Sequence, residues 1–515
     1  MKKKLPIGIQ SFEQLRENNC YYVDKTPKLL QLIDEGKYYF ISRPRRFGKS
    51  LMVDTLQCLF EGRKRLFEGL HAENEWDWST SYPVVRFGFG DGVMQNREQL
   101  DDRINQQLAD NRKRLGLNEN TALDIPGNFR NLMLEAKAKC GQNVVVLIDE
   151  YDKPILDNLH NSEAAIANRE GLKNLYSVIK DADEFIKFAL LTGVSKFSKV
   201  SLFSGLNNLT DITLTKRYSD ICGYTDHDLD TIFAPELIDH NRALIRQWYN
   251  GYSWRGTSVY NPFDILLYFA NQEFHPYWFE SATPTFLVNV LKERQIQPLE
   301  LTNYYSDHDL LGHFDVDHIT TEALLFQTGY LTIKSESEPV PGAIGYDLSF
   351  PNMEVEISLN KALLPTLGLE INAVTRKRLP IFKALQTCDF AALETHLKSL
   401  YASIPHDWYR KNNIQNFEGH YASIFYSHFA ALGLHVAVED SSVNGKVDMA
   451  IQYDNKTFIF EFKVVADKPL GNALAQIKAK NYAQKYVRES WTIYGIGVEF
   501  SKAQRQVVAL EAQVL

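Results

Sequence analysis

The segment 43–50 carries the residue types that bind phosphate, in the order that the chemistry requires. It reads Arg-Pro-Arg-Arg-Phe-Gly-Lys-Ser, follows the apolar run 38–41, and leads into apolar residues at helical spacing from Met52 onward. Strand, loop and helix in this order favour a P-loop, because the unpaired N–H groups and the dipole of a helix N-terminus attract phosphate. We expect Lys49 to reach the β- and γ-phosphate oxygens and the Ser50 hydroxyl to bind Mg²⁺.

Two carboxylates at the end of a second strand support this interpretation. The buried-strand run 144–148 ends in Asp149 and Glu150, so that one acid can complete a Mg²⁺ shell and the other can orient or deprotonate water. The alternative is a core strand that simply runs into a charged loop. Together the two segments predict a site for Mg-ATP, with hydrolysis inferred from the acid pair.

Alternatives stay open at two positions of the predicted nucleotide site. Arg43 stands where the usual P-loop pattern has its first glycine, and a bare Gly-Lys-Ser also occurs in surface turns. Thr192 ends another apolar strand, where it either contacts the γ-phosphate or simply terminates the strand. The expected nucleotide contacts are Arg43, Arg46, Phe47, Gly48, Lys49, Ser50, Leu51, Asp149 and Thr192.

Near the C-terminus, two alternating runs predict a β-hairpin. Residues 445–451 and 457–463 flank the dipeptide 454–455, whose Asp and Asn tolerate left-handed backbone and suit a two-residue turn. In the register set by that turn Asp448 lies directly opposite Glu461, with the side chains about 5 Å apart. Strand alternation then buries three residues on the other face, namely Phe458, Phe460 and Phe462.

The facing carboxylates need a counter-charge, because two acids on one face of an apolar sheet repel each other. A divalent cation supplies it: Mg²⁺, or Mn²⁺ in its place, binds a few carboxylates, waters and substrate phosphate, and lowers the pKa of bound water. Lys463 shares this face and can position that water or stabilise the developing phosphorane charge. Glu418, in the first turn of an upstream helix, is a further candidate ligand. A surface ion-pair cluster is the alternative.

The elements that must position these residues fall into several domains, since 515 residues exceed one ordinary domain. Apolar runs alternate with helical patterns over 38–194, which predicts a parallel α/β sheet. A helical, aromatic stretch over 226–299 is typical of a lid, and 320–350 predicts a helix with a long-looped hairpin, as in a winged helix. The predicted divisions are the P-loop domain 1–225, the lid and winged-helix-like region 226–360, a helical connector 361–408 and a C-terminal α/β domain 409–515.

Composition limits the class of protein. Hydrophobic residues make up 44% and charged residues 23%, as in globular proteins, and a net charge of -8 leaves any nucleic-acid binding to local basic surfaces. Five scattered cysteines without a Cys-x-x-Cys spacing argue against a zinc knuckle or a disulfide framework. Because the chain also shows no apolar signal segment and no membrane-spanning run, we expect a cytoplasmic protein without membrane contact. We interpret His428 as a core histidine and His435 as a surface histidine.

Several segments together resemble the bacterial AAA-ATPase-like family, over the chain up to about residue 360. They are Phe12-Glu13, 22–26, 43–50, 147–154, 192–195, 249–252 and 351–355. In that family the Arg-Pro-Arg-Arg-Phe-Gly-Lys form is usual, so Arg43 is consistent with the resemblance. The resemblance implies ATP binding.

The C-terminal pattern resembles the PD-(D/E)XK nuclease superfamily, in the version that is fused to the ATPase-like family. The residues that match its motif are Glu418, Asp448, Glu461, Lys463 and Gln476. The resemblance implies metal binding by the three acids and catalytic roles for the lysine and for the glutamine of the following helix. Val447 stands where the superfamily usually has a proline before the first aspartate.

A predicted nucleotide site and a predicted metal site on one chain favour an ATP-regulated endonuclease that cleaves DNA. In this hypothesis the nucleotide bound to the P-loop domain controls the C-terminal domain. RNA as the substrate and a homo-oligomeric state both stay open. One alternative is a nucleotide-dependent switch whose C-terminal fold binds nucleic acid or protein without cutting. The other is an ATPase that remodels a partner.

Overall fold

The chain folds into two compact units. The computed structural model describes residues 2–515 apart from 119–122, 160, 197–207, 283–284, 295, 309–310, 312–319, 368–370, 403–417 and 443–444. Unit 1 comprises Met1–Phe286 and Tyr305–Asn352, and unit 2 comprises Leu287–Tyr304 and Met353–Leu515. The division into four regions at residues 225, 360 and 408 stays a prediction.

A five-stranded sheet forms the centre of unit 1; four of its strands lie in the segment 38–194 for which the sequence predicts a parallel sheet, and the fifth was not predicted. Its order is β2-β3-β4-β1-β5, and every neighbouring pair is parallel. The strands are β1 (Tyr38–Ser42), β2 (Val84–Gly88), β3 (Val144–Asp149), β4 (Ile186–Gly193) and β5 (Thr210–Asp211). β1 and β3 are buried along their whole length, which explains their uninterrupted apolar runs, because a parallel sheet is covered on both faces.

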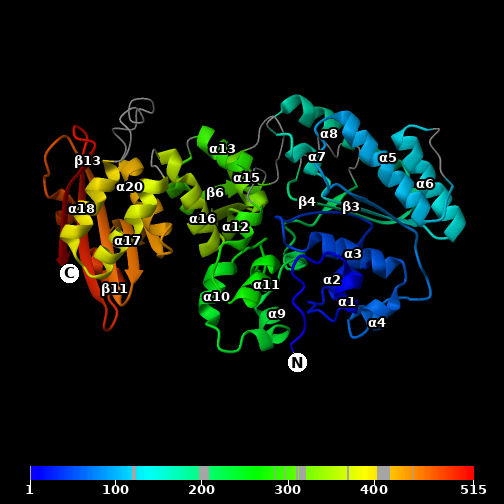
Figure 1. Cartoon of the computed structure of the whole chain (residues 1–515), viewed down its shortest axis with the longest axis horizontal. Coiled ribbons are helices and arrows are strands. Elements are labelled where there is room, and N and C mark those ends of the chain that lie inside the picture. Colours follow the sequence, from blue (N-terminus) through cyan, green and yellow to red (C-terminus); the bar gives the residue numbers. More distant parts are fainter. Residues whose placement is uncertain are drawn as a thin grey trace. The chain divides into compact units, whose positions relative to one another are not determined.

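Helices cover both faces of this sheet (Figure 1). α3 (Lys49–Phe60) follows β1 on one face, whereas α5 (Arg97–Arg114), α6 (Ile125–Cys140) and α8 (Ser162–Asp181) pack together on the other. The shorter helices are α1 (Phe12–Glu17), α2 (Thr26–Glu35), α4 (Ala72–Glu75) and α7 (Lys153–Leu156). Because the strands are parallel, β1, β3 and β4 all end at one edge of the sheet, which is where ligands of such sheets bind.

The rest of unit 1 is mainly helical, as predicted for a lid. Its helices α9 (Asp226–Thr231), α10 (Arg242–Tyr249), α11 (Pro262–Asn271) and α12 (Tyr277–Ala282) follow one another, and many of their aromatic side chains share one buried cluster. α15 (Thr321–Thr328) then leads into the hairpin of β7 (Thr332–Ser337) and β8 (Gly345–Ser349). Helix and hairpin match the winged-helix expectation. A third strand, β6 (Tyr304–Asp307), lies beside β8 and was not predicted.

Unit 2 is built on a mixed sheet in the order β13-β12-β11-β10-β9. The strands are β9 (Val436–Ser442), β10 (Gly445–Tyr453), β11 (Lys456–Val465), β12 (Thr492–Ser501) and β13 (Gln506–Val514). β10 and β11 form the predicted hairpin, and its register, which pairs Met449 with Phe460, is confirmed. Asp454 and Asn455 at the tip have φ of 48° and 57°, the left-handed pair that a tight hairpin turn requires. β13 was not predicted.

Helices pack on both faces of the second sheet. α17 (Ile371–Gln386), α18 (Phe390–Tyr401) and α20 (Glu418–Ala430) lie on the face that buries Phe458, Phe460 and Phe462 (Figure 1), and α16 (Met353–Leu363) packs against α20. α21 (Asn472–Ala479) lies on the opposite face. α13 (Thr285–Glu293) belongs mostly to this unit. His428 is fully buried in α20 and His435 is exposed, as interpreted from the sequence.

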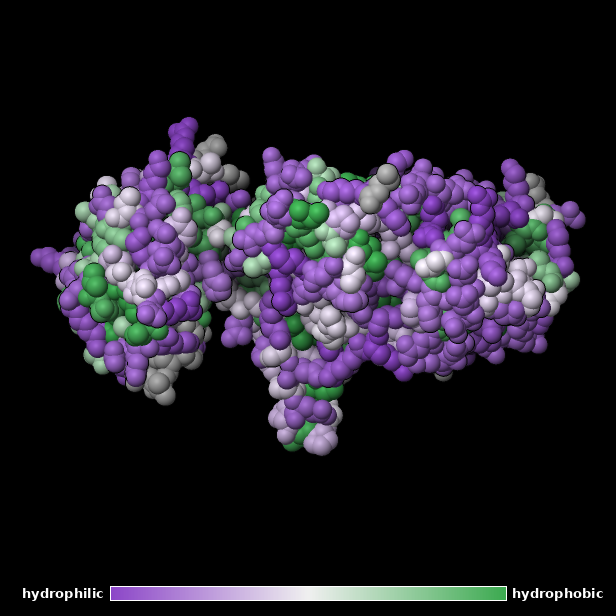
Figure 2. Space-filling view, turned by 90° about the horizontal axis from the view of Figure 1, so that it is seen from below, coloured by the Kyte–Doolittle hydropathy of each residue, from purple (hydrophilic) through white to green (hydrophobic). Residues whose placement is uncertain are grey.

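On the side shown in Figure 2, hydrophilic residues predominate and hydrophobic residues form small separate groups. Some large apolar side chains are mostly exposed, for example Ile238 in unit 1 and Leu470 in unit 2, which is ordinary for protein surfaces. Among the described residues, no helix combines the length and the apolar character needed to cross a membrane.

Candidate nucleotide and metal sites

The loop between β1 and α3 brings the N-terminus of α3 and the side chain of Lys49 together. Gly48 is the N-cap of α3 and has a φ of 90°, a left-handed conformation that side chains disfavour. The ammonium group of Lys49 donates hydrogen bonds to the backbone oxygens of Arg43 at 2.9 Å and Pro44 at 3.0 Å. The lysine therefore lies inside the curve of the loop, where it can exchange carbonyl partners for phosphate oxygens.

Asp149 and Thr192 end the adjacent strands β3 and β4 beside this loop. The Thr192 hydroxyl donates a hydrogen bond of 2.6 Å to Oδ1 of Asp149, and both side chains are buried. Thr192 thus holds the carboxylate that we expect to bind Mg²⁺. Direct contact between Thr192 and a γ-phosphate stays a prediction.

Glu150 follows Asp149 in an unusual backbone conformation. Its φ is 53°, in the left-handed region that costs a non-glycine residue about 1 kcal/mol or more. Burial raises the pKa of the Glu150 carboxyl, and the charge of Lys49 opposes this shift. Burial likewise lowers the pKa of Lys49, against the charges of Glu150 and Asp149. A carboxylate with a raised pKa beside a phosphate-binding lysine can accept a proton from water.

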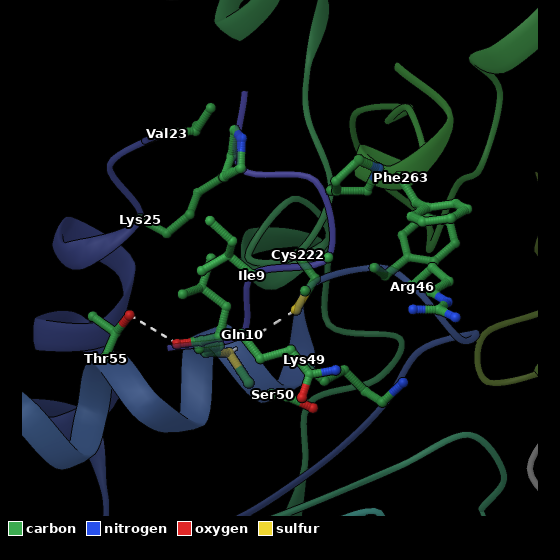
Figure 3. A pocket seen from close by; sticks show the side chains of 18 of the residues that line it. Ile9, Gln10, Val23, Lys25, Arg46, Lys49, Ser50, Thr55, Cys222 and Phe263 are labelled. Atoms are coloured by element: carbon green, nitrogen blue, oxygen red, sulfur yellow. Dashed lines mark hydrogen bonds between the residues drawn. The ribbon is translucent and has the colours of Figure 1, made fainter. Parts of the chain in front are cut away.

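A pocket of about 370 Å³ opens at this edge of the sheet. Lys49 and Glu150 line it, together with residues of other segments, namely Ile9, Tyr22, Val23, Cys222 and Tyr224. Figure 3 shows Lys49, Ser50 and Arg46 on one side of the pocket and Val23 and Thr55 on the other. A pocket of this size with both cationic and apolar lining residues suits a nucleotide. Six of the predicted contacts line it, namely Arg46, Phe47, Gly48, Lys49, Ser50 and Leu51.

Arg43 is buried and supports the loop between β1 and α3 through hydrogen bonds to backbone oxygens. Its guanidinium donates hydrogen bonds to the backbone oxygens of Ser42, Thr213 and Tyr218, at 2.8, 3.0 and 3.1 Å. The guanidinium carbon also lies 4.1 Å from the centre of the Trp254 ring. Burial lowers the pKa of Arg43 to about 10, so the side chain stays charged at neutral pH. Arg43 is not among the residues that line the described pocket, and its role as a nucleotide contact stays a prediction.

Asp448 and Glu461 lie on neighbouring strands, at the point where the regular pairing of β10 with β11 ends. The last regular pair is Met449 with Phe460. Beyond it, Oδ2 of Asp448 accepts a hydrogen bond of 2.8 Å from the backbone N–H of Phe462. The hairpin therefore opens one residue earlier than its register alone predicts, because a side-chain oxygen takes the place of a backbone acceptor. Asp448 remains beside the residue that precedes Phe462, which is Glu461.

Glu461 is fully buried and holds two donors on one oxygen. Its Oε1 accepts hydrogen bonds from the ammonium group of Lys463 at 3.0 Å and from the side-chain amide of Gln476 on α21. The Lys463 side chain is 29% exposed, so it connects the buried acid with the surface. The structure thus brings together four residues that the sequence singled out, namely Asp448, Glu461, Lys463 and Gln476.

The donor set suits a divalent cation that prefers oxygen ligands. Carboxylates from two neighbouring strands, one of them wholly buried, are what Mg²⁺ uses when waters and substrate phosphate complete its shell. Among the described residues, no three His, Cys, Asp or Glu side chains gather as a metal cluster. Glu418 is the first residue of α20, but its side chain lies outside the described part of the chain. A third ligand from Glu418 stays a prediction.

Comparison with known proteins finds a family match in each of two segments of the chain. A family model described as predicted AAA-ATPase matches residues 6–203, and a model described as PD-(D/E)XK nuclease superfamily matches residues 416–510. The chain is 51% identical, over all 515 of its residues and 99% of the other protein, to "Uncharacterized protein in vnfD 5'region" of Azotobacter chroococcum mcd 1. The chain belongs to the AAA-ATPase-like family and carries a PD-(D/E)XK nuclease superfamily domain. Both resemblances seen in the sequence are confirmed.

The nuclease superfamily domain contains a buried acid that sequence reasoning missed. Glu499 on β12 is 2% exposed. Its carboxylate accepts hydrogen bonds from three backbone N–H groups at the start of α21, those of Leu470, Asn472 and Ala473, at 2.5, 2.7 and 3.4 Å. An acid there satisfies unpaired donors and the helix dipole. Gly497, on the same face of β12, lies so close to α21 that a Cβ would overlap its backbone. These contacts fix the helix that carries Gln476.

The ATPase-like domain also contains an acid to which the sequence gave no role. Asp152 is buried, and its carboxylate accepts hydrogen bonds from the backbone N–H of Val194 and from both the N–H and the hydroxyl of Ser195. Burial raises the pKa of Asp152. The contacts join the segment after β3 to the segment after β4, so Asp152 fixes the edge of the sheet at which Asp149 and Thr192 meet.

Proposed function

We propose that the ATPase-like domain binds and hydrolyses ATP with Mg²⁺, and that the nuclease superfamily domain uses a divalent cation to cleave DNA under control of the bound nucleotide. The observation that carries the proposal is the grouping of Asp448, Glu461, Lys463 and Gln476 around one opened hairpin. A purely structural ion-pair cluster would gain little from burying a carboxylate completely, because burial of charge costs stability.

The residues of the hairpin and Gln476 of α21 can have separate roles in phosphodiester hydrolysis. Asp448 and Glu461 would hold the cation, which supplies an activated water when bound. The Lys463 ammonium, partly exposed at the strand end, can stabilise charge on the phosphate oxygens as water attacks phosphorus. The amide of Gln476 orients the Glu461 carboxylate by hydrogen bonding.

The polar residues that line the pocket support ATP as the substrate of this site. Lys49 can bind the terminal phosphates, and Ser50 and Asp149 would hold Mg²⁺. Glu150, whose pKa is raised by burial, can take the proton of the attacking water.

Purified chain incubated with supercoiled plasmid tests the proposal, in Mg²⁺ or Mn²⁺ and with ATP, ADP or no nucleotide. We expect cleavage that requires the cation, changes with the nucleotide, and falls by at least about 100-fold in Asp448→Ala and Lys463→Ala. Asp454→Asn is a matched control, since Asp454 lies at the hairpin tip and is 59% exposed. Lys49→Ala should remove only the nucleotide effect. Wild-type cutting by Asp448→Ala would refute the assignment of the cleavage site, and cleavage of RNA alone would change the substrate.

A further inference from the structure

The cations around the nucleotide pocket differ in their partners. Two lysines of the lining form ion pairs, Lys25 with Asp228 at 3.0 Å and Lys153 with Asp157 at 2.6 Å. Lys49 donates to loop carbonyls. The remaining lining cations are Arg45 and Arg46, and within the described residues neither pairs with a carboxylate. Arginines that face a pocket without a counter-ion are prepared to receive an anion.

The two arginines both line the pocket, and Arg46 has an aromatic neighbour. The Arg46 guanidinium lies over the ring of Phe263 on α11, 4.8 Å from its centre (Figure 3). Arg45 lines the same pocket as Lys49 and Glu150. Gly90 also lines the pocket, and a Cβ there would lie 3.2 Å from the Glu150 carboxylate.

The backbone of Arg45 is held while its side chain faces the pocket. The indole N–H of Trp278 donates a hydrogen bond of 3.1 Å to the Arg45 carbonyl oxygen. The preceding residue, Pro44, packs against Gly329, where a Cβ would come within 2.8 Å of the proline ring. A charge whose attachment point is fixed stabilises a transition state without the cost of reorganising the protein.

We propose that Arg45 contacts the terminal phosphate of ATP and stabilises the charge that develops there during hydrolysis, so that each chain supplies its own catalytic arginine. This inference rests on the proposed ATP hydrolysis. In that step a water oxygen bonds to the γ-phosphorus as the bond from this phosphorus to the bridging oxygen breaks. The electron pair of the broken bond stays on ADP, the water proton passes to Glu150, and ADP and inorganic phosphate are released.

Steady-state ATP turnover of the full chain, together with titration by a fluorescent ADP analogue, tests this role. For Arg45→Ala we expect kcat to fall by at least about 100-fold while the Kd for ADP changes by less than about threefold. Arg45→Lys should lie between this variant and wild type, because a lysine keeps the charge but not the planar fork. Arg65→Ala is the matched control, since Arg65 is exposed and outside the pocket. Circular dichroism checks that each variant folds.

Mixing two inactive variants distinguishes an arginine of the same chain from one of a second chain. Arg45→Ala keeps a nucleotide site and Lys49→Ala keeps Arg45, so a mixture would regain turnover only if the arginine acted between chains. We expect no recovery, and turnover per chain that is independent of protein concentration. Recovery, or a wild-type kcat in Arg45→Ala, would overturn the inference alone. A wild-type chain that binds ATP without turnover would instead refute the proposed hydrolysis, and this inference with it.

Discussion

The carboxylate of Asp448 accepts the backbone N–H of Phe462 at 2.8 Å. In an unbroken antiparallel pair that N–H would meet a backbone oxygen of the facing strand. One side chain thus has two effects: it opens the hairpin between β10 and β11, and it keeps a carboxylate beside Glu461. The hydrogen bond needs only an oxygen, whereas the proposed cation needs the negative charge.

Asp448→Asn separates these two effects. We expect the variant to keep the fold, since the amide oxygen can still accept the N–H of Phe462, and to lose DNA cleavage by at least about 100-fold because the charge is gone. Isothermal titration with Mn²⁺ should show weaker binding, while the melting temperature stays close to that of wild type. A variant that binds Mn²⁺ and cuts normally would contradict the assignment.

Glu499 offers a test of positioning without contact to substrate. Lys463 on β11 and Glu499 on β12 are partners in the parallel register, and the Glu499 carboxylate holds the first N–H groups of α21. We expect Glu499→Ala to cost about 1.5–3 kcal/mol, as lost bonds to a buried charge do. Hydrogen exchange should rise across α21, and cleavage should fall with it. Glu489→Ala, an exposed acid in the same domain, should change neither.

Thr192 should act on ATP turnover through Asp149. Loss of the 2.6 Å hydrogen bond between them leaves the carboxylate less well oriented, and such supporting contacts are worth about 10–100-fold at metal sites. We expect Thr192→Val to raise the Mg²⁺ concentration that half-activates turnover, with little change in ADP affinity. An increase in the Kd for ADP without any change in Mg²⁺ dependence would show that Thr192 instead contacts the nucleotide.

Arg43→Gly makes the loop conform to the common P-loop pattern, and the structure predicts that it harms the protein. The change removes a buried guanidinium that bonds three backbone oxygens and stacks on Trp254. Because buried acceptors are then left unsatisfied, we expect a loss of about 3 kcal/mol or more in the stability of unit 1. Urea denaturation measures it. Unchanged stability would mean that Arg43 is not a structural residue.

Because His428 is buried, we expect the protein to lose stability in acid. Both of its ring nitrogens are buried without a hydrogen-bond partner among the described residues, and burial, assisted by the charge of Arg378, lowers its pKa from 6.5 to about 3. Below about pH 6.5 the His428 side chain therefore binds a proton in the unfolded chain but not in the folded chain. Stability from this residue is complete above that pH and declines by up to about 1.4 kcal/mol per unit as pH falls toward 3.

The measurement for His428 is hydrogen exchange across α20 between pH 7 and pH 5, corrected for the intrinsic pH dependence of exchange. We expect His428→Leu to reduce the pH-dependent increase in opening, and the exposed His435→Gln to leave it unchanged. Equal pH dependence in wild type and His428→Leu would assign the acid sensitivity to other groups.

Local pattern was enough to predict four strands of the sheet of unit 1, β1 to β4, and the hairpin of unit 2. Strand β1 coincides with the apolar run that precedes the P-loop, because a strand covered on both faces excludes polar residues. The hairpin register followed from the dipeptide Asp454-Asn455, since a two-residue turn fixes every later pair. In these places neighbouring residues decide the structure.

The features that could not be predicted depend on partners far away in the sequence. The partners of Arg43 include Thr213 and Tyr218, about 170 residues later in the chain. Glu499 meets the start of α21, and only the fold reveals that its charge is capped there. The early end of the β10–β11 pairing also depends on a side-chain hydrogen bond, which strand alternation does not contain.

Glu150 has a left-handed backbone, so a substitution that stabilises the fold at this position would also remove the carboxylate proposed for ATP turnover. A glycine would adopt that φ without the strain of about 1 kcal/mol that a side chain incurs. A search for more heat-resistant variants would therefore tend to enrich Glu150→Gly, and the chains it recovered would have lost the group proposed to accept the proton. A glutamate at a position where glycine would be less strained fits the proposed role of Glu150 as the proton acceptor.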